Sequence, residues 1–599
     1  MQQWRLEIPD CPPELVRRLR DELSVSGALA QILVRRGLHD PTAARAFLGR
    51  AEHHPASAFR GIGDAVGVIG EHLACRRRIT IHGDYDVDGV CSTAILVRAL
   101  RALGADVDWY LPDRASDGYG LNMATVARLA ERGTKLLITA DCAIGAVEEV
   151  AAARALGLDV VVTDHHTPRT DGTLPRAPIV HPALCGYPCP ELCATAVAYK
   201  LAEALFESAG RHADELAEDL DLVALATIAD VVPLLGENRT LAAAGLRRLA
   251  GTAKPGLRAL MAASGVAAGA VNERAVAFAL APRLNAAGRL YRADAALELL
   301  LTEDTARAGE VARELDSMNS ERREVERGIR FEAEAQMAQL GEQPAYVLSA
   351  DGWHAGVTGI VASRLLELSG RPVVLIALDG ERGRASGRSP ENFDLLAGLQ
   401  ACSTHLLRYG GHRAAAGLEI ERSRVPEFAL ALCEHARQTI ATDGVVEVEL
   451  VDAVLEGGEV SMALAEELLL LAPFGRGNPR PNLLIDGAAF EDLRPMGEGK
   501  HLRFTVRSHG VGARAVAFGC GSSLPVQEGE PAQATFSLEV NEWNGASEPR
   551  LVLRRVRAIE PEPGAPPLRA NEPDASVEAP AGEREAVEEE PRQLELALF

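Results

Sequence analysis

Carboxylates and imidazoles recur at four places in the sequence, each directly after an apolar stretch. They are His82, Asp84, Asp86 and Asp88 in one glycine-bounded loop, then Asp141, then Asp164, His165 and His166, and finally Asp230. Three carboxylates within five residues repel one another and stay ionised most easily around cations. Carboxylates and imidazoles suit Mn²⁺ or Mg²⁺, and two such ions about 4 Å apart can activate a shared water and orient it at phosphorus. The pattern favours a two-metal centre for hydrolysis of phosphate esters.

The elements that must position these residues alternate between strands and helices. Short apolar stretches predict strands at 78–81, 107–111, 135–139, 160–163 and 179–181, with helical patterns such as 92–103 between most of them. This alternation indicates a parallel sheet covered on both faces, and ligands bind at the carboxyl ends of its strands. All four acidic places, including Asp230 after the apolar run 222–228, are therefore interpreted as strand ends. One strand-end aspartate is commonly a helix cap, but capping explains four such places poorly.

The rest of the chain divides by its residue pattern. Residues 1–50 have helical periodicity, and 303–340 predict one long charged helix, either a connector between domains or a solvated surface helix. A second α/β segment runs from 345 to 438, and short strands from 446 to 558 predict a small β-barrel. Residues 561–592 are rich in Pro, Glu and Ala, and we expect them to be disordered.

Composition limits the class of protein. The 599 residues are 47% hydrophobic, enough for three or four domains. Because the net charge is −23, any contact with DNA must be a basic groove on an acidic body. Ten scattered cysteines do not suit a secreted disulfide scaffold, and Cys185, Cys189 and Cys193 lack the spacing of paired metal knuckles. With no signal core and no apolar run long enough to span a bilayer, a cytoplasmic protein is expected.

Several motifs, in order, resemble a known family. GDYDVDGVCS (83–92), ITADC (138–142), TDHH (163–166) and IADVVPL (228–234) closely resemble the DHH phosphoesterase superfamily. Five more motifs resemble the RecJ-type single-strand exonucleases within it: RLNAAGRL (283–290), DGWHAGVTGIVASRL (351–365), SGRS (386–389), RYGGHRAAAG (408–417) and APFGRGNPRP (472–481). The resemblance covers roughly residues 20–557, and several motifs in order are more specific than any one of them.

The resemblance implies an α/β fold. A parallel-sheet DHH domain would be joined by a long helix to a smaller DHHA1-type α/β domain, followed by an OB-fold β-barrel and a disordered acidic tail. The implied segments are an N-terminal helical segment (1–50), the DHH catalytic domain (51–302), the connecting helix (303–340), the DHHA1-type substrate-binding domain (341–440), the OB-fold domain (441–560) and the tail with its terminal hydrophobic peptide (561–599).

The resemblance also implies a role for each acidic or histidine residue. One of two divalent ions, Mn²⁺ or Mg²⁺, would be held by His82, Asp86 and Asp141, and the other by Asp88, Asp141, His165 and Asp230. Asp84 and Asp164 would orient these ligands, and His166 would contact the scissile phosphate. The sequence departs from the family at Ala143, where a glycine is expected near Cys142. This changes the backbone freedom beside Asp141 without removing a ligand.

Other residues would bind the substrate. Arg114 and Arg289 match positions near phosphates, although Arg114 could be an ordinary loop residue and Arg289 could pair with an acid. Ser386 and Arg388, in the SGRS turn, would hold a 5′-terminal phosphate. Gly410, Gly411 and His412 would form a close backbone approach to DNA, and His354 either contributes or is a buried structural histidine. The barrel candidates for stacking and charge contacts are Arg503, Phe504, Arg514, Phe518 and Trp543, with Phe504 and Phe518 favoured as core residues.

The implied activity is 5′-to-3′ exonuclease action on single-stranded DNA, releasing 5′-mononucleotides, in recombination and repair. Single-strand-binding protein is a further candidate partner. The end of the tail, Gln593–Phe599, resembles the short peptides that bind the bacterial sliding clamp, although it could equally be solvated. Two alternatives remain at this point. One is a DHH phosphodiesterase for short oligonucleotides or cyclic dinucleotides, and the other is a non-catalytic DNA-binding scaffold, which should have lost ligands that this sequence retains.

Overall fold

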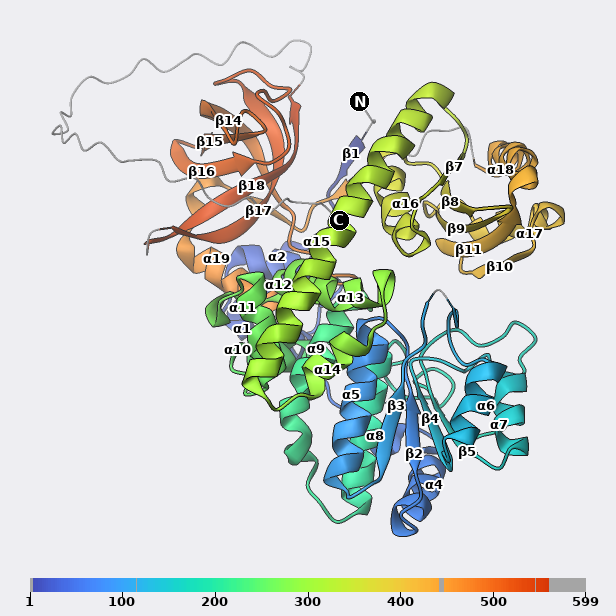
Figure 1. The fold of residues 1–599 in the computed structure, drawn as a ribbon. Coiled ribbons are helices and arrows are strands. Elements are labelled where there is room, and N and C mark those ends of the chain that lie inside the picture. Colours follow the sequence, from blue (N-terminus) through green and yellow to red (C-terminus); the bar gives the residue numbers. More distant parts are fainter. Residues whose placement is uncertain (1–3, 115, 441–446, 544–545, 560–599) are drawn as a thin grey trace, which may run out of the picture. The chain divides into compact units, whose positions relative to one another are not determined.

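The computed structural model describes residues 4–114, 116–440, 447–543 and 546–559 (Figure 1). The chain divides into two compact units. The larger unit is Gly49–Val445 with Pro473–Pro479, and the smaller unit is Met1–Leu48 with Val446–Ala472 and Arg480–Phe599. The six segment boundaries given by the sequence stay predictions. Among the described residues, no helix has both the length and the apolar character to cross a membrane.

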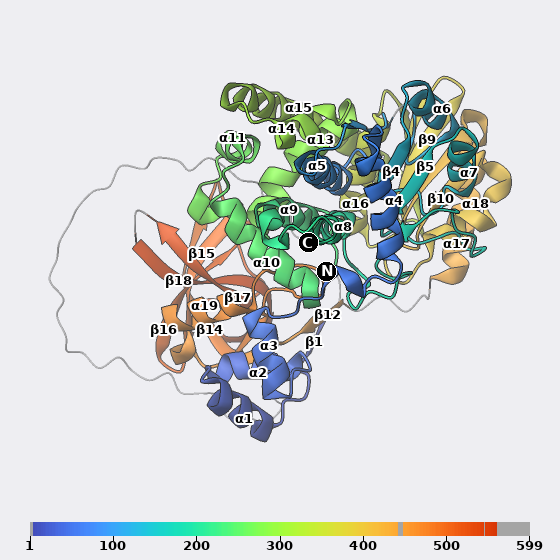
Figure 2. The same cartoon turned by 90° about the horizontal axis from the view of Figure 1, so that it is seen from below.

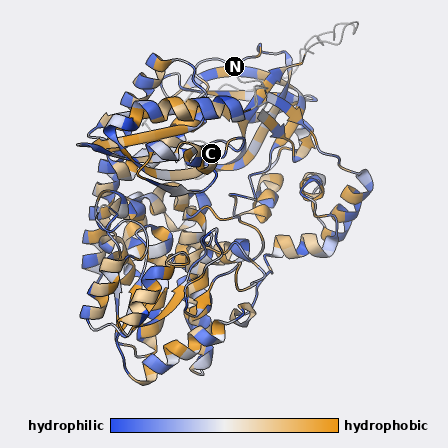
Figure 3. Cartoon of the chain, turned by 90° about the vertical axis from the view of Figure 1, so that its right-hand side faces the viewer, coloured by the Kyte–Doolittle hydropathy of each residue, from blue (hydrophilic) through white to orange (hydrophobic). Residues whose placement is uncertain are grey.

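A five-stranded parallel sheet lies at the centre of the first part of the larger unit. Its strands are β2 (Ile79–His82), β3 (Val107–Tyr110), β4 (Leu136–Ala140), β5 (Asp159–Thr163) and β6 (Ile179–Val180). Their order in the sheet is β3-β2-β4-β5-β6, and every neighbouring pair is parallel. The predicted strands are confirmed to within a residue or two. Figure 3 shows these strands as strongly hydrophobic, as expected for a sheet buried on both faces.

Helices cover both faces of this sheet (Figures 1 and 2). Those on one face are α4 (Ile62–Ala74), α5 (Val87–Ala102) and α8 (Ala194–Ser208), and those on the other are α6 (Met123–Glu131) and α7 (Val147–Ala155). The chain passes from β2 to β3 on one side and returns across β2 to β4. The order therefore reverses between β2 and β4, and a crevice at the carboxyl ends of these two strands is the expected ligand site.

A set of helices follows the sheet. It comprises α9 (Leu220–Ala229), α10 (Gly236–Ala250), α11 (Pro255–Ser264), α12 (Glu273–Ala275), α13 (Ala281–Leu290) and α14 (Asp294–Leu301). The prediction that Asp230 follows a strand is wrong, because Asp230 caps the carboxyl end of helix α9. The run 222–228 is buried on all sides, and a fully apolar run has no periodicity that distinguishes a strand from a buried helix.

Helix α15 (Thr305–Leu340) is the predicted long charged helix, and it connects two hydrophobic cores. Val311, Ala312 and Leu315, near its start, pack into the core of the parallel-sheet domain. Ile329, Ala333 and Met337, near its end, pack into the core of the following α/β domain. Two stretches of α15 are therefore buried, each against a different hydrophobic core. This excludes the alternative of a solvated surface helix.

The second α/β domain has a five-stranded mixed sheet. Its strands, in the order β10-β11-β9-β8-β7, are β7 (Tyr346–Asp351), β8 (Val373–Asp379), β9 (Arg382–Arg388), β10 (Arg408–Gly411) and β11 (Ala415–Glu421). Its helices are α16 (Ala355–Ser369), α17 (Leu395–Ala401) and α18 (Val425–Thr439). The prediction that SGRS (386–389) forms a turn is wrong for Ser386 and Arg388. Ser386 and Arg388 lie on β9, and Gly410 and Gly411 lie on the edge strand β10, because antiparallel pairing outweighs the low strand propensity of glycine.

The smaller unit contains the predicted N-terminal helices and the predicted barrel. The helices are α1 (Pro13–Leu23), α2 (Gly27–Arg35) and α3 (Pro41–Gly49), with α19 (Met462–Leu468) nearer the barrel. Five strands close the barrel through a β14–β17 pairing: β14 (Leu483–Met496), β15 (His501–Ser508), β16 (Val511–Ala517), β17 (Pro531–Trp543) and β18 (Ala546–Ala558). A short β13 (Ala453–Leu455) extends β14.

One barrel strand was assigned to the wrong segment. The sequence pattern at 446–451 predicts a barrel strand, but β12 (Glu447–Leu450) instead pairs in parallel with β1 (Trp4–Glu7) in a separate two-stranded sheet. The missing barrel strand is β14, whose register shifts twice along its length. Such bulges interrupt the alternation of polar and apolar residues by which a strand is found in sequence.

Candidate metal and phosphate site

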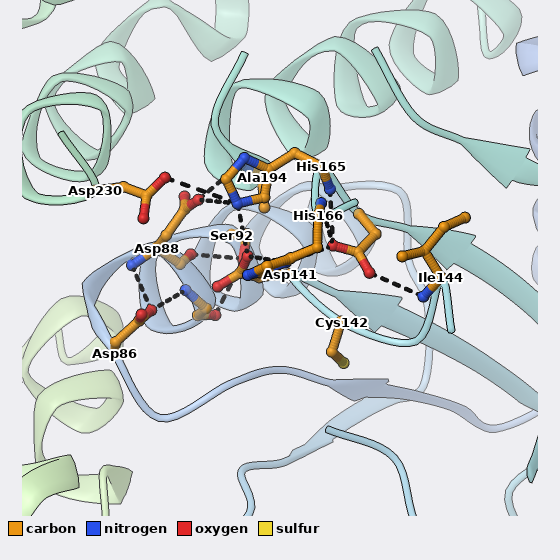
Figure 4. Close-up of polar contacts among 12 residues, drawn as sticks. Asp86, Asp88, Ser92, Asp141, Cys142, Ile144, His165, His166, Ala194 and Asp230 are labelled. Atoms are coloured by element: carbon orange, nitrogen blue, oxygen red, sulfur yellow. Dashed lines mark hydrogen bonds and ion pairs between the residues drawn. The ribbon is translucent and has the colours of Figure 1, made fainter. Parts of the chain in front are cut away.

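The four predicted acidic places converge beyond the carboxyl ends of β2, β4 and β5 (Figure 4). Three groups of side chains have ligand atoms within 4.8 Å of one another: Asp84 with Asp86 and Asp141, Asp141 with His165 and His166, and Asp88 with His165 and Asp230. Asp141 and His165 each belong to two groups. The arrangement therefore suits two neighbouring cations that share Asp141, as the sequence predicts.

Asp141 occupies a strained turn at the end of β4. Its φ is 67° and that of Ala143 is 82°, both in the left-handed region that favours glycine. Residues held in such conformations cluster at functional sites, where the surrounding structure stabilises them. The sequence departs from the family pattern at Ala143, and the backbone there has the left-handed conformation that glycine adopts most easily. The carboxylate of Asp141 is almost fully buried, and burial together with Asp88, Asp86 and Asp84 raises its pKa well above the usual range.

The loop after β2 is fixed by the start of helix α5. Asp86 is the N-cap, and its Oδ1 accepts hydrogen bonds from the backbone N–H of Asp88 (3.0 Å) and Gly89 (3.1 Å). A Cβ on Gly89 would lie 2.5 Å from the backbone nitrogen of Asp84, so only glycine allows this approach. Helix capping therefore occupies only Oδ1 of Asp86. The Asp86 carboxylate can still serve as a metal ligand together with Asp84 and Asp141.

Asp88 is held by the N-terminus of helix α8. Its Oδ2 accepts the backbone N–H of Ala194 (2.7 Å), and its Oδ1 accepts the backbone N–H and the hydroxyl of Thr195 (2.7 and 2.6 Å). The partial positive charge of a helix start stabilises a carboxylate there. Asp88 is thus oriented before any cation binds, and Thr195 is a positioning residue that no sequence pattern indicates.

In the Asp164-His165-His166 triplet, Asp164 orients the two histidines, and both histidines face the other acidic residues. Asp164 accepts hydrogen bonds from the backbone N–H of His165 and Ile144 and lies 2.8 Å from Nδ1 of His166. Burial lowers the pKa of His166, but the Asp164 hydrogen bond and the charges of Asp164, Asp230 and Asp86 outweigh it and raise the pKa to about 9. Nε2 of His165 lies 3.3 Å from Asp141 Oδ1 and 3.7 Å from both Asp88 and Asp230 Oδ2.

His82 is fully buried at the end of β2. Its Nε2 has no hydrogen-bond partner, and burial lowers its pKa to about 4, which keeps the imidazole neutral as a metal ligand must be. Its Nδ1 lies 3.5 Å from Sγ of Cys142. Within the described part of the chain, none of the three ligand groups includes His82. Its role as a ligand stays a prediction.

The chemistry of the cluster fits divalent cations. Four buried atoms of the acidic and histidine residues have no hydrogen-bond partner: Nε2 of His82, Oδ1 of Asp84, Oδ1 of Asp141 and Nε2 of His165. Buried polar atoms without partners are costly and need an explanation. Burial and the neighbouring Asp88 and Asp86 also raise the pKa of Asp230 to about 8. Cations among these oxygens and nitrogens would satisfy the partnerless atoms and relieve the repulsion.

Three of the predicted arginines gather near the carboxylate loop. Arg289 is half-buried, and desolvation, together with the charges of Arg114 and Arg322, lowers its pKa to about 10. Arg388 has its pKa lowered by burial and then by Arg114, which stacks 4.4 Å from the ring centroid of Tyr85. No ion pair to a carboxylate occurs at Arg114, Arg289 or Arg388 among the described residues. Like-charged side chains that form no ion pair with a carboxylate make a site for an anion.

The remaining predicted substrate residues lie on the second α/β domain. Ser386 and Arg388 of β9 both face Gly359 of α16, where an added Cβ would lie 3.1 Å from the Arg388 guanidinium. Gly410 and Gly411 are exposed on β10, and His412 follows in a turn closed by its N–H to the carbonyl of Ala415. His354 caps helix α16 through the N–H of Gly356, so it has a structural role in any case.

The barrel candidates differ in exposure. Phe504 is buried in the barrel core, as favoured, while Phe518 is half-buried against His501. Arg503 is exposed, and Arg514 pairs with Glu548 at 2.6 Å. The side chain of Trp543 and the whole terminal peptide Gln593–Phe599 lie outside the described residues. Cys185, Cys189 and Cys193 are buried free thiols, and no cysteine joins a ligand group in the described part of the chain.

Tyr119 is a site residue that sequence reasoning missed. Its hydroxyl lies 3.2 Å from Nδ1 of His166 and 3.5 Å from the backbone oxygen of Asp141. Burial, Asp164 and Asp141 raise its pKa, so the phenol stays protonated: its O–H can donate to the backbone oxygen of Asp141, and its oxygen can accept from the protonated ring of His166. The only signal was its place five residues after Arg114 in LPDRASDGYG.

Replacing Tyr119 with phenylalanine should lower kcat about tenfold and leave KM nearly unchanged, because one hydrogen bond at His166 is lost. Steady-state kinetics on a labelled single strand would measure this. Tyr346→Phe, on β7, gives a matched control, because the Tyr346 hydroxyl also donates to a backbone oxygen, that of Gly341. A kcat equal to that of the unaltered protein would contradict a role for the Tyr119 hydroxyl.

Comparisons with known proteins agree with this architecture. Residues 78–227 match the DHH family, N-terminal domain, residues 342–438 match the DHHA1 domain and residues 451–555 match the RecJ OB domain. The fold and the acidic site thus define a DHH-type protein that also carries DHHA1 and OB domains.

Comparison with complete proteins identifies the family within this class more specifically. The chain is 39% identical to the single-stranded-DNA-specific exonuclease RecJ of Bacillus subtilis over 570 residues, which are 93% of this chain and 71% of the relative. Against the Thermus thermophilus protein of the same name it is 40% identical over 510 residues, 84% of this chain and 72% of the relative. A crystal structure of RecJ from Thermus thermophilus in complex with Mn²⁺ matches with a TM-score of 0.81 and 35% identity, covering 93% of this chain and 80% of that one. The chain belongs to the RecJ family.

Proposed function

We propose that this protein is a metal-dependent exonuclease that degrades single-stranded DNA from the 5′ end and releases 5′-mononucleotides, in recombination and repair. The observation that carries the proposal is the pairing of two opposite charge clusters in one unit: buried carboxylates and imidazoles with partnerless ligand atoms, and near their loop three arginines without acidic partners. The first cluster suits divalent cations and the second suits phosphate. The names and the Mn²⁺-bound structure of the relatives support the same activity.

Each group of residues would have a separate role in hydrolysis. His82, Asp86 and Asp141 would hold one Mn²⁺ or Mg²⁺ ion, and Asp88, Asp141, His165 and Asp230 the other. Bound there, the ions would supply a nucleophilic water at neutral pH and neutralise charge on the phosphate. Asp164 holds the protonated ring of His166 toward the cluster, where it can donate to a phosphate oxygen as negative charge develops. Arg114 and Arg289 would lie near phosphates, and Ser386 and Arg388 would hold the 5′-terminal phosphate. The backbone at Gly410, Gly411 and His412 would approach the DNA closely.

A substrate series tests this function. We expect rapid release of mononucleotides from a long 5′-phosphorylated single strand, slower action on the same strand with a 5′-hydroxyl, and none on a blunt duplex. Preferred hydrolysis of a dinucleotide or cyclic dinucleotide would instead favour the first alternative. DNA binding without any hydrolysis in Mn²⁺ or Mg²⁺ would favour the non-catalytic scaffold.

Added Mn²⁺ should raise the Tm of the protein, and by more at about pH 8 than at about pH 5. The carboxyls of Asp84, Asp141 and Asp230 have raised pKa values in the folded protein, about 8 for Asp230. Without cations, the free energy of unfolding therefore falls as pH rises from the unfolded pKa of about 4 toward the folded values, because the folded state releases its protons later. Cations replace those protons over the same window. Thermal melts with MnCl₂ and with a chelator would measure the difference, and an equal gain at both pH values would contradict it.

The terminal peptide Gln593–Phe599 is proposed as a ligand of the sliding clamp, and single-strand-binding protein as a further partner. The support is the peptide's composition, Gln followed by Leu and Phe after an acidic linker. Removing the seven residues should abolish clamp binding in a titration while nuclease activity on free strands is unchanged. Equal clamp affinity of the shortened protein would overturn this assignment. A cytoplasmic location also stays a prediction.

A further inference from the structure

Helix α13 lies directly against the loop that carries the acidic residues. A Cβ on Gly288 would lie only 2.1 Å from the backbone oxygen of Tyr85, so the helix and the loop pack at backbone distance. Asn285, one turn earlier, accepts a hydrogen bond at Oδ1 from the backbone N–H of Val87, at 3.1 Å. Val87 is the residue between Asp86 and Asp88. The helix therefore fixes the middle of the acidic loop from outside.

This hydrogen bond also determines how the Asn285 amide is oriented. The backbone N–H of Val87 can only donate, so the oxygen of the amide must face it and the NH₂ group must face the other way. No acceptor for that NH₂ occurs among the described residues, and Nδ2 is absent from the enclosed atoms that lack a partner, so it is open to the surroundings. Asn285 thus presents two free N–H donors beside the acidic loop.

The position of these donors points to a phosphate. Arg289 follows Asn285 by four residues, so the two side chains lie on the same face of α13. Arg289 is one of the three arginines without an acidic partner, and the charge of Asp86 also acts on it. Asn285 therefore lies between the carboxylates that suit the cations and the arginines that suit an anion. Because cations would bind on one side of the Asn285 amide and an anion on the other, we expect a phosphate oxygen to be the acceptor of its NH₂ group.

We propose that Asn285 is a substrate-binding residue of the nuclease, whose carbonyl anchors Val87 and whose NH₂ donates to a non-bridging oxygen of the scissile phosphate. This rests on the proposed function. The residue connects the two halves of the site: one end of its amide holds the metal-binding loop in place, and the other contacts the group that is hydrolysed.

Two substitutions separate the two ends of the amide. Asn285→Asp keeps an oxygen for the Val87 N–H but replaces the NH₂ with a second oxygen, which repels phosphate. We expect kcat/KM on a 5′-phosphorylated single strand to fall about 100-fold, with Mn²⁺ affinity and Tm close to those of the unaltered protein. Asn285→Leu loses both ends, and Mn²⁺ should then bind about tenfold more weakly as well, because the loop has lost its anchor. Mn²⁺ titrations would be measured beside the kinetics.

Asn272→Asp is the matched control, since Asn272 caps α12 through the same kind of oxygen-to-backbone hydrogen bond. It should leave both readouts unchanged. An Asn285→Asp variant with kcat/KM within threefold of the unaltered protein would overturn the assignment, as would one whose Mn²⁺ affinity falls in parallel with its activity. If the unaltered protein itself leaves a single strand intact, the proposed function falls, and this assignment with it.

Discussion

Replacing Asp141 with asparagine should reduce kcat on single-stranded DNA by at least about 1,000-fold, the largest effect we expect from any single substitution. Asp141 belongs to two of the three ligand groups, so its carboxylate is the one placed to serve both cations. Asparagine keeps the shape and can adopt the left-handed backbone found here at φ 67°. The loss would then come from charge rather than from misfolding.

The same substitution should raise the Tm of the protein in a chelator. Burial and four neighbouring carboxylates raise the pKa of Asp141, so its negative charge destabilises the cation-free fold near neutral pH. Asp106→Asn is the matched control, because Asp106 is exposed and directly precedes β3, at the amino ends of the strands of the same sheet. Kinetics in Mn²⁺ and thermal melts in chelator would measure both effects. A variant that retains more than about a tenth of the activity would exclude Asp141 as a shared ligand.

The convergence of the site could be predicted because parallel strands end at one edge of a sheet. Strands β2, β4 and β5 are short buried runs bounded by polar residues, and Asp141 and the Asp164 triplet follow two of them directly. Local sequence is enough for such residues. Asp230 follows a helix rather than a strand, but its carboxylate still lies beside Asp88 and His165.

The parts that sequence did not predict depend on contacts between distant segments. Thr195 on Asp88, Tyr119 on His166 and Asn285 on Val87 are separated from their partners by 107, 47 and 198 residues. None of the three residue types is unusual where it stands in the sequence. Strand β14 was missed for a different reason, since its two register shifts break the alternation that marks a strand. The sequence therefore indicated the acidic and histidine residues that converge, while the contacts of Thr195, Tyr119 and Asn285 needed the fold.

Replacing Arg289 with methionine should lower kcat/KM on a 5′-phosphorylated strand about 100-fold and at the same time raise the Tm of the protein. Arg289 is half-buried among like charges, and desolvation and those charges lower its pKa to about 10. For a cation whose folded pKa lies below its unfolded value, the charged form is disfavoured in the folded state. This destabilisation is present at every pH below about 10 and disappears only as pH rises toward the unfolded value. Methionine fills a similar volume without the charge.

Inorganic phosphate would separate a binding role of Arg289 from a structural one. An anion that binds only the folded protein stabilises it, so phosphate should raise the Tm of the unaltered protein and have little effect on Arg289→Met. Arg327→Met, on the exposed part of α15, is the matched control and should behave as the unaltered protein. If Arg289→Met instead lowered the Tm and left kcat/KM intact, Arg289 would be a structural residue held by its 3.3 Å contact with the carbonyl of Gly356. The expected result would mean that the fold tolerates a destabilising cation because the substrate, rather than an acidic side chain, neutralises it.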